Sequence, residues 1–190
     1  MSHSTKLPIP EAYWVEENRF LAGEYPGSRD PKTMRLRINA FLEAGITAFI
    51  DLTEARELVP YEATLKELAG LRGIDVAHQR IPIRDLSVPS SDTMTSILDA
   101  IDQAIGGGQC VYVHCWGGIG RTGMAVGCYL VRHGMSNEQA LEKVNELFKT
   151  RPADPYHSRA PETDAQVEFV RNWWDDSDKL NRSLKCFCEG

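Results

Sequence analysis

Cys115 precedes Arg121 by six residues, and glycines crowd the segment between them. Residues 111–123 read VYVHCWGGIGRTG, an apolar strand followed by a turn. A loop that joins a strand to a helix directs successive backbone N–H groups into one concavity, and the helix adds the positive end of its macrodipole. The pattern predicts a site for a phosphate dianion with a nucleophile at its floor. The alternative is a buried strand-end cysteine beside a helix-capping arginine.

The two chemical groups of this segment have complementary roles. Cys115 is expected to be a thiolate, because a helix N-terminus and an adjacent cation stabilise the charged form of a thiol, and the thiolate is the nucleophile. Arg121 offers a planar fork that can hold two phosphate oxygens and stays charged throughout. The glycines let the backbone approach the phosphate closely. The predicted phosphate-binding residues are Trp116, Gly117, Gly118, Ile119, Gly120 and Arg121.

The residues that flank this loop are candidates for supporting roles. His114 should point to the opposite side of the strand from Cys115, which favours an organiser of the loop over a proton carrier. Thr122 follows Arg121, and its hydroxyl could bind the thiolate and improve it as a leaving group. An ordinary cap in the first turn of the helix is an equally good interpretation of Thr122.

Cleaving a phosphoester also requires a proton for the departing oxygen, so a second residue must reach the site. Asp85 is the predicted donor. It lies in residues 81–90, IPIRDLSVPS, whose two prolines exclude a helix interior or a central strand. This loop follows a predicted strand, which places Asp85 at the sheet edge where the neighbouring strand delivers Cys115. Asp92 is the second choice, and a surface turn is the alternative for Asp85.

Strand-like and helix-like segments alternate along the chain, which predicts a sheet covered by helices and one α/β domain over 1–190. One or two short strands are expected within 13–22, and others at 46–52, 74–81 and 110–113. Helices are expected at 31–45, 61–71, 91–106, 122–133, 136–149 and 162–174. Asp30, Ser90 or Ser91, and the Ser136–Gln139 pair provide the cap signals. The end of the chain from about 177 is expected to be mobile.

Composition limits the classes of partner. The chain has 190 residues, 42% hydrophobic and 25% charged, and a net charge of −6. That charge argues against nonspecific nucleic-acid binding, so a phosphate site must be locally positive. No apolar segment suits a signal peptide or a membrane span, and a cytoplasmic location is expected. Basic residues that the fold could gather are Arg80, Arg84, Arg121, Arg132, Arg151, His157 and Arg159.

The five cysteines lack the regular spacing of a disulfide framework or a zinc site, so we expect reduced thiols and no metal. Cys186 and Cys188 are separated by one residue, which is weak as a redox or metal motif. An exposed thiolate at Cys115 would be oxidised readily to a sulfenic acid. Cys110 and Cys128 are the candidates to trap it as a disulfide. The sequence gives no prediction of oligomeric state.

Residues 111–130, and less completely the loop at 81–90, resemble the cysteine-dependent protein tyrosine phosphatases, and the short length resembles their dual-specificity branch. The resemblance implies a central, mainly parallel twisted sheet flanked by helices. It also implies that Cys115 attacks phosphorus while Asp85 protonates the leaving group, and that water then hydrolyses the phosphocysteine with Asp85 as base. No metal or other cofactor is implied. Residues 161–166, PETDAQ, resemble a segment in which a glutamine positions the hydrolytic water, so Gln166 is a candidate; otherwise it is a surface residue of the last helix.

The resemblance also directs the choice of substrate. Residues 19–27, RFLAGEYPG, look like the opening strands of small dual-specificity enzymes. The chain has no long phosphotyrosine-recognition loop of the kind that the larger tyrosine-specific enzymes carry, which argues against exclusive tyrosine specificity. The resemblance therefore implies phosphotyrosine in proteins or peptides, with phosphoserine and phosphothreonine as further substrates. The loop has no lysine at 116–120, whereas related phosphoinositide phosphatases often have lysines there. Charge from the rim could still come from Arg84, Arg151, His157 or Arg159. A phosphoinositide or other small-molecule phosphatase, a phosphopeptide-binding pseudophosphatase and a sulfurtransferase are the alternatives.

Overall fold

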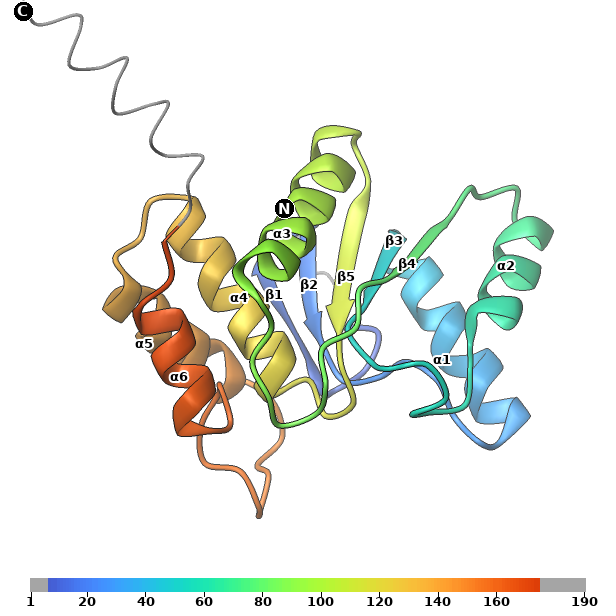
Figure 1. Cartoon of the computed structure of the whole chain (residues 1–190). Coiled ribbons are helices and arrows are strands. Elements are labelled where there is room, and N and C mark those ends of the chain that lie inside the picture. Colours follow the sequence, from blue (N-terminus) through green and yellow to red (C-terminus); the bar gives the residue numbers. More distant parts are fainter. Residues whose placement is uncertain (1–6, 175–190) are drawn as a thin grey trace, which may run out of the picture.

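The computed structural model describes residues 7–174, and the predicted mobile end with Cys186 and Cys188 lies outside this range. A five-stranded sheet forms its centre (Figure 1), in the order β1-β2-β5-β3-β4. Only β1 and β2 pair antiparallel; every other neighbouring pair is parallel. The expected α/β fold with a mainly parallel sheet is therefore confirmed. The strands are β1 (Ala12–Glu16), β2 (Phe20–Gly23), β3 (Ile46–Asp51), β4 (Ala77–Arg80) and β5 (Cys110–His114).

Helices cover both faces of the sheet (Figure 1), and each face has its own hydrophobic cluster. One face carries α1 (Pro31–Glu43) and α2 (Glu62–Leu71). The other carries α3 (Ser91–Gly106), α4 (Gly120–Arg132), α5 (Asn137–Phe148) and α6 (Asp164–Arg171). Within residues 7–174, no helix has both the length and the apolar content to span a bilayer.

The predicted helix starts agree with the observed caps at three helices. Asp30 accepts a hydrogen bond from the Thr33 amide, Ser90 caps α3, and Ser136 forms a capping box with Gln139. These bonds satisfy amide groups that have no partner inside the helix. The ends of other elements differ more from the prediction. Strand β4 covers 77–80 instead of 74–81, and α6 ends at Arg171 instead of 174. The Asn137 side chain donates to the carbonyls of Val170 and Trp173, which binds the open end of α6.

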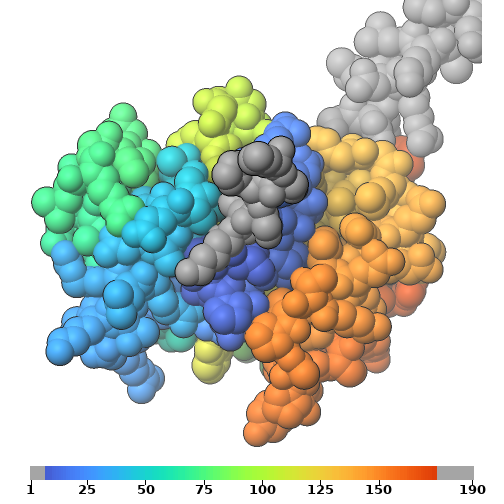
Figure 2. Space-filling model, turned by 180° about the vertical axis from the view of Figure 1, so that it is seen from behind, coloured from blue at the N-terminus to red at the C-terminus, as the bar shows by residue number. Residues whose placement is uncertain are grey.

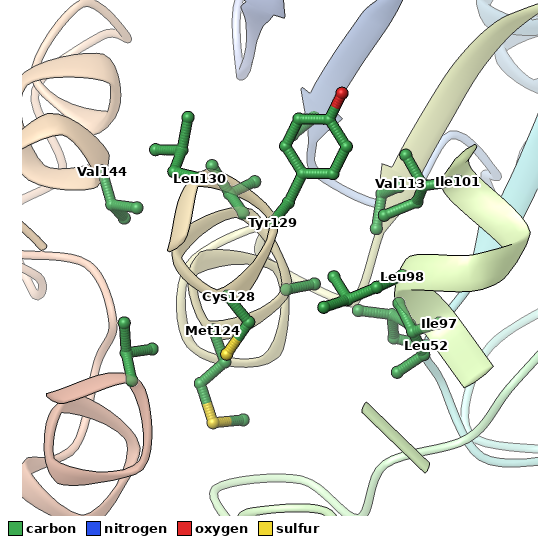
Figure 3. Packing of buried hydrophobic residues seen from close by; sticks show 14 of the residues in the cluster. Leu52, Ile97, Leu98, Ile101, Val113, Met124, Cys128, Tyr129, Leu130 and Val144 are labelled. Atoms are coloured by element: carbon green, nitrogen blue, oxygen red, sulfur yellow. The ribbon is translucent and has the colours of Figure 1, made fainter. Parts of the chain in front are cut away.

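Helix α4 is enclosed by the rest of the domain. Its side chains spread around the axis (Figure 3), with Leu98 and Ile101 of α3 on one side and Val144 of α5 on the other. Four apolar residues of α4 have no exposed surface: Met124, Ala125, Val126 and Cys128. Burial of a side chain the size of Met124 or Val126 contributes roughly 1.5–3 kcal/mol. The start of α4, which is also the end of the glycine-rich loop, is thereby held in place.

The carboxyl ends of the parallel strands meet at one edge of the sheet. The last row of the register aligns Gly23 of β2, His114 of β5, Asp51 of β3 and Arg80 of β4. The segments that follow these residues gather along the lower edge in Figure 1. In open sheets of this kind, ligands bind at the carboxyl ends of the strands. Cys115, the first residue after β5, lies on this edge.

Candidate active site

Cys115, Arg121 and Asp85 line one cavity of about 590 Å³. Cys115 follows β5, Arg121 lies in the first turn of α4, and Asp85 lies in the loop after β4. Cys115 and Arg121 are 3% and 1% exposed, whereas the Asp85 side chain is 47% exposed. The fold thus brings the three predicted catalytic residues together. The other lining residues are Glu11, Glu24, Leu86, Trp116, Gly117, Ile119, Gly120, Arg151, Pro152, Ala153, Asp154, Pro155, Tyr156, His157 and Glu162.

The guanidinium of Arg121 is fixed by acceptors from two other loops. Glu57, in the loop after β3, accepts from Nη1 at 2.8 Å and from Nη2 at 2.7 Å. The Ile83 carbonyl accepts from Nη1 at 3.1 Å, and Asp85 Oδ1 lies 2.9 Å from Nη2. The sequence reasoning missed Glu57, because no motif sets it apart from the neighbouring Glu54. Its position could have indicated it: Glu57 follows β3 by six residues, and β3 ends at the same edge of the sheet as β5.

Charges around Arg121 reinforce one another. Burial disfavours a charged guanidinium, but hydrogen bonding to Glu57 and the nearby side chains of Cys115 and Asp85 outweigh it and raise the pKa of Arg121 further above its ordinary value. Burial also disfavours the charged form of Glu57, which raises its pKa. Hydrogen bonds from Arg121 and from the Glu54 amide have the larger, opposite effect, so the pKa of Glu57 lies below its ordinary value. Glu57 and Arg121 therefore form a charged, two-point pair.

The glycine-rich loop is clamped from both sides. Gly118 has a φ of +68°, and a Cβ there would lie 2.2 Å from the carbonyl carbon of Gly23 on β2. Next to this contact, the amide of Tyr25 donates to the Trp116 carbonyl at 2.8 Å. From the opposite side, Arg151 donates to the carbonyls of Gly117 and Gly118, each at 3.0 Å. Gly118 is the one residue of 116–120 that does not line the cavity.

His114 lies on the opposite side of β5 from Cys115, as predicted. It is fully buried, with Nε2 2.7 Å from the Tyr61 hydroxyl and Nδ1 3.9 Å from Asp51. Burial lowers the pKa of His114 to about 4, so the ring is neutral at pH 7. Asp51 in turn accepts hydrogen bonds from Thr53 and Arg80. A buried polar network therefore supports the strand end from which the loop departs.

The alternatives for Thr122 and Gln166 are wrong. Ile119 stands at the N-cap of α4 with no side-chain cap, and the buried Thr122 hydroxyl has no hydrogen-bond partner within residues 7–174. Gln166 is fully buried instead of exposed on the last helix. Its Nε2 donates to the Ser87 carbonyl at 3.3 Å, and a Cβ on Gly120 would lie 2.7 Å from its Oε1. Gln166 thus connects the start of α4 to the loop that carries Asp85.

The rim of the cavity is more acidic than expected. The segment between α5 and α6, orange in Figure 2, projects at the lower edge of the molecule and supplies Tyr156, His157 and Asp154 to the lining. His157 pairs with Asp154 and Glu162, and Arg159 pairs with Asp164. Arg84 and Arg159 do not line the cavity. Of the four basic residues expected at the rim, Arg151 lies against the loop carbonyls, and only His157 remains at the rim.

Cys110, one of the two cysteines expected as redox partners, lies too far from Cys115 to bond with it. Cys110 is the first residue of β5 and Cys115 follows its last, a separation of roughly 16 Å at the rise of a strand. A disulfide needs Cα atoms within about 7 Å, so Cys110 cannot trap an oxidised Cys115. Cys128 lies two turns into α4, in the hydrophobic cluster shown in Figure 3. Within residues 7–174, no three His, Cys, Asp or Glu side chains are placed to hold a metal ion.

Comparison with known proteins finds several phosphatases among the relatives of this chain. Residues 26–135 match the family model described as Tc-R-P, "Polymorphic toxin system, DSP-PTPase phosphatase". Mouse dual specificity protein phosphatase CDC14B is 29% identical over 193 residues, 96% of this chain and 36% of that protein. The Arabidopsis thaliana phosphatidylinositol 3,4,5-trisphosphate 3-phosphatase and protein-tyrosine-phosphatase PTEN1 is 31% identical over 109 residues, 56% of this chain and 24% of that protein.

Solved structures of similar fold also include phosphatases. The crystal structure of Tk-PTP in the active form has a TM-score of 0.63 and 26% identity, covering 85% of this chain and 95% of that chain. The chain spans about half, or less, of the length of the first curated relatives that it matches. The family model covers more than half of the chain, including the Cys115–Arg121 loop and the Asp85 loop. The chain therefore belongs to the DSP-PTPase phosphatase family, within the cysteine-dependent protein tyrosine phosphatases.

Proposed function

We propose that the protein hydrolyses phosphomonoesters without a metal, acting on phosphotyrosine in proteins through a phosphocysteine at Cys115. The observation that carries the proposal is the convergence of Cys115, Arg121 and Asp85 on one cavity. They come from different segments, and a structural role alone does not require them to meet. We also propose that residues 1–190 form a single phosphatase domain.

In the first step, the Cys115 thiolate attacks phosphorus and the bond to the ester oxygen breaks. Arg121 and the loop amides would bind the equatorial oxygens, where charge spreads during transfer. Before substrate binds, Asp85 lies 2.9 Å from Arg121. An incoming phosphate competes for the same guanidinium and would release the Asp85 carboxylate. Asp85 must then take up a proton from solvent, and in this protonated form it gives that proton to the leaving oxygen.

In the second step, water attacks the phosphocysteine, Asp85 accepts its proton and the Cys115 thiolate leaves. Gln166 is the proposed residue that positions this water. Its side chain lies against Gly120 and binds the loop that carries Asp85. Gln166 is therefore placed to keep the proton acceptor and the phosphate loop in register.

The walls of the cavity favour an aromatic monoester with a single phosphate. Tyr156 and Trp116 both line it and are 89% and 57% exposed, so an aryl ring can pack between apolar surfaces. Carboxylates at the rim would repel further phosphates on the same small ligand. Phosphotyrosine therefore fits better than a polyphosphorylated inositol. The rim carboxylates that have no arginine partner among the described residues are Glu11, Asp154 and Glu162.

Turnover of p-nitrophenyl phosphate tests the proposal. The wild-type protein should release nitrophenol in the presence of a chelator, and Cys115→Ser should be inactive while keeping its fold. Activity retained by Cys115→Ser would contradict the mechanism. A wild-type protein that binds a phosphotyrosine peptide tightly yet releases no phosphate would instead be a pseudophosphatase.

A further inference from the structure

A second cavity, of about 660 Å³, lies beside the first and shares Trp116 and Glu24 with it. It is bordered by the loop after β2 and the loop after β3, both at the carboxyl edge of the sheet. The proposed reaction does not use it. Its other lining residues are Tyr25, Gly27, Ser28, Arg29, Ala55, Arg56, Glu57, Leu58, Val59, Pro60 and Arg80.

The charges of this second cavity are unbalanced. Each of its two carboxylates is already paired with an arginine outside the lining: Glu24 with Arg37 and Glu57 with Arg121. Arg29 and Arg56 are exposed and form no ion pair with the described part of the chain. Two uncompensated cations therefore face a cavity in a protein whose net charge is −6.

The third arginine of the lining is partly engaged. Arg80 binds the buried Asp51 through Nε and Nη2, at 3.1 and 2.8 Å, and its side chain is 30% exposed. The Asp51 charge offsets that of Arg80, so Arg80 adds hydrogen-bonding capacity more than net charge. The positive potential of the cavity depends on Arg29 and Arg56.

The two loops are tied to each other. The Tyr25 hydroxyl donates to the Val59 carbonyl at 3.0 Å. A Cβ on Gly27 would lie 2.5 Å from the Tyr25 ring, so the loop after β2 packs against that ring without space for a side chain. Arg56 is held at a φ of +69°, a backbone region uncommon for residues with side chains. The loops that carry Arg29 and Arg56 are therefore joined to each other.

Both loops are also joined to the phosphate loop. Tyr25 donates to Trp116, and Glu57 binds Arg121. A ligand in the second cavity would consequently sit at a defined distance from a phosphate held by Arg121. Separate surface cations would not give such a fixed spacing.

We propose that the second cavity binds an anionic side chain, carboxylate or phosphate, that flanks the phosphotyrosine in a peptide substrate. The proposal rests on the function proposed above and specifies its substrate. Trp116 lines both cavities, so the two anions lie on either side of an indole ring. An extended peptide advances about 3.3 Å per residue, so a side chain one to three residues away can reach across. An inositol phosphate carries all its phosphate groups around one small ring. Its further phosphates would therefore lie beside the rim carboxylates of the first cavity and would not reach the second.

The test compares three phosphotyrosine peptides of one length, with alanine, glutamate or phosphoserine at the flanking positions. Each enzyme is judged by the ratio of kcat/KM for an acidic peptide to that for the alanine peptide, which cancels general loss of activity. The variants are Arg29→Gln and Arg56→Asn, singly and together, since asparagine tolerates the backbone angle at 56. Arg35→Gln on α1, which breaks an exposed pair with Glu67 of α2, is the matched control for a single arginine substitution because it removes the same charge.

The wild-type protein and Arg35→Gln should prefer the acidic peptides. Each variant of the second cavity should lower the ratio by about fivefold, the effect of an exposed ion pair, and the double variant should bring it near one. Added salt should shrink the wild-type ratio. Preference for glutamate, phosphoserine or both would identify the anion.

Three results would overturn the assignment: no acidic preference in the wild type, an unchanged ratio in the double variant, or an arginine-dependent preference for an inositol bisphosphate over the peptides. A wild-type protein inactive on p-nitrophenyl phosphate would reject the proposed function itself, so the two failures can be told apart.

Discussion

The carboxylate of Glu57 accepts two hydrogen bonds from the guanidinium of Arg121, although the two residues are 64 positions apart in the chain. Arg121 is 1% exposed, and Glu57 reaches it from the loop after β3. The pair sets the plane of the fork before any phosphate arrives. A fork already oriented loses little rotamer entropy when it binds two oxygens.

Glu57→Gln should lower kcat/KM for p-nitrophenyl phosphate by roughly 10- to 100-fold, because small displacements of a binding group cost that much. The neutral amide keeps the size of the side chain but replaces one acceptor oxygen with an NH2 donor, so the contact of Nη1 and Nη2 with two separate oxygens is lost. Initial rates measure the loss. Glu54→Gln, in the same loop, is the control and should retain wild-type rates; equal loss in both would contradict the role of Glu57.

Asp85→Asn should slow phosphotyrosine hydrolysis by roughly 100-fold or more, the usual contribution of a general acid. The loss should be smaller for p-nitrophenyl phosphate, because nitrophenolate departs with little protonation. Steady-state kinetics on both substrates give the comparison. Asp92→Asn, in the first turn of α3, should behave as wild type. An Asp85 variant slowed equally on both substrates would not fit a proton donor.

Gly118→Ala should destabilise the protein far more than Gly73→Ala. Both glycines have a positive φ, +68° and +64°, so both substitutions carry the same backbone cost of roughly 1–2 kcal/mol. Only at 118 would the added Cβ meet backbone, 2.2 Å from Gly23, whereas at 73 nothing lies within 4 Å. Overpacking adds roughly 1–3 kcal/mol. Urea unfolding measures the difference, and equal destabilisation would refute the close approach.

Stability should fall as the pH drops from 6.5 to 4. The pKa of His114 is about 4 in the folded protein, against an ordinary 6.5. Between these values the unfolded chain binds a proton that the folded chain does not, so the stabilisation is complete above 6.5 and lost towards 4. The change is roughly 3 kcal/mol.

Urea midpoints recorded across this range give that slope. His114→Asn should reduce it. An NMR titration showing His114 protonated near pH 6.5 would exclude this explanation.

Local signals predicted much of the fold. Asp30, Ser90 and Ser136 cap helices at the expected positions, because a cap depends on residues within one turn. The glycine spacing located the phosphate loop for the same reason. Asp85 was found by combining a local loop signal with the rule that parallel strands end at one edge.

Contacts between distant segments were not predictable in this way. Glu57 and Arg151 approach the loop from positions 58 residues before and 36 residues after Cys115, and no local pattern records that approach. Arg151 appears in the sequence as a spare cation, yet its donors are used by two loop carbonyls. The alternative interpretation of Gln166 as a surface residue was wrong. Its burial depends on a distant residue, Gly120, where any side chain would collide with Gln166.

The contact between Gly118 and Gly23 means that the shape of the nucleophile loop depends on two strands, β5, which precedes the loop, and β2, which packs against it. Transplanting residues 114–122 into another α/β protein would carry the thiol, the guanidinium and the glycines, but not the bare backbone at the end of β2 that gives the loop its shape. The host would need a glycine at that strand end and an amide facing the Trp116 carbonyl. A designer who wishes to move this chemistry must therefore move a strand pair, because the smallest transferable unit is larger than the motif that reveals it.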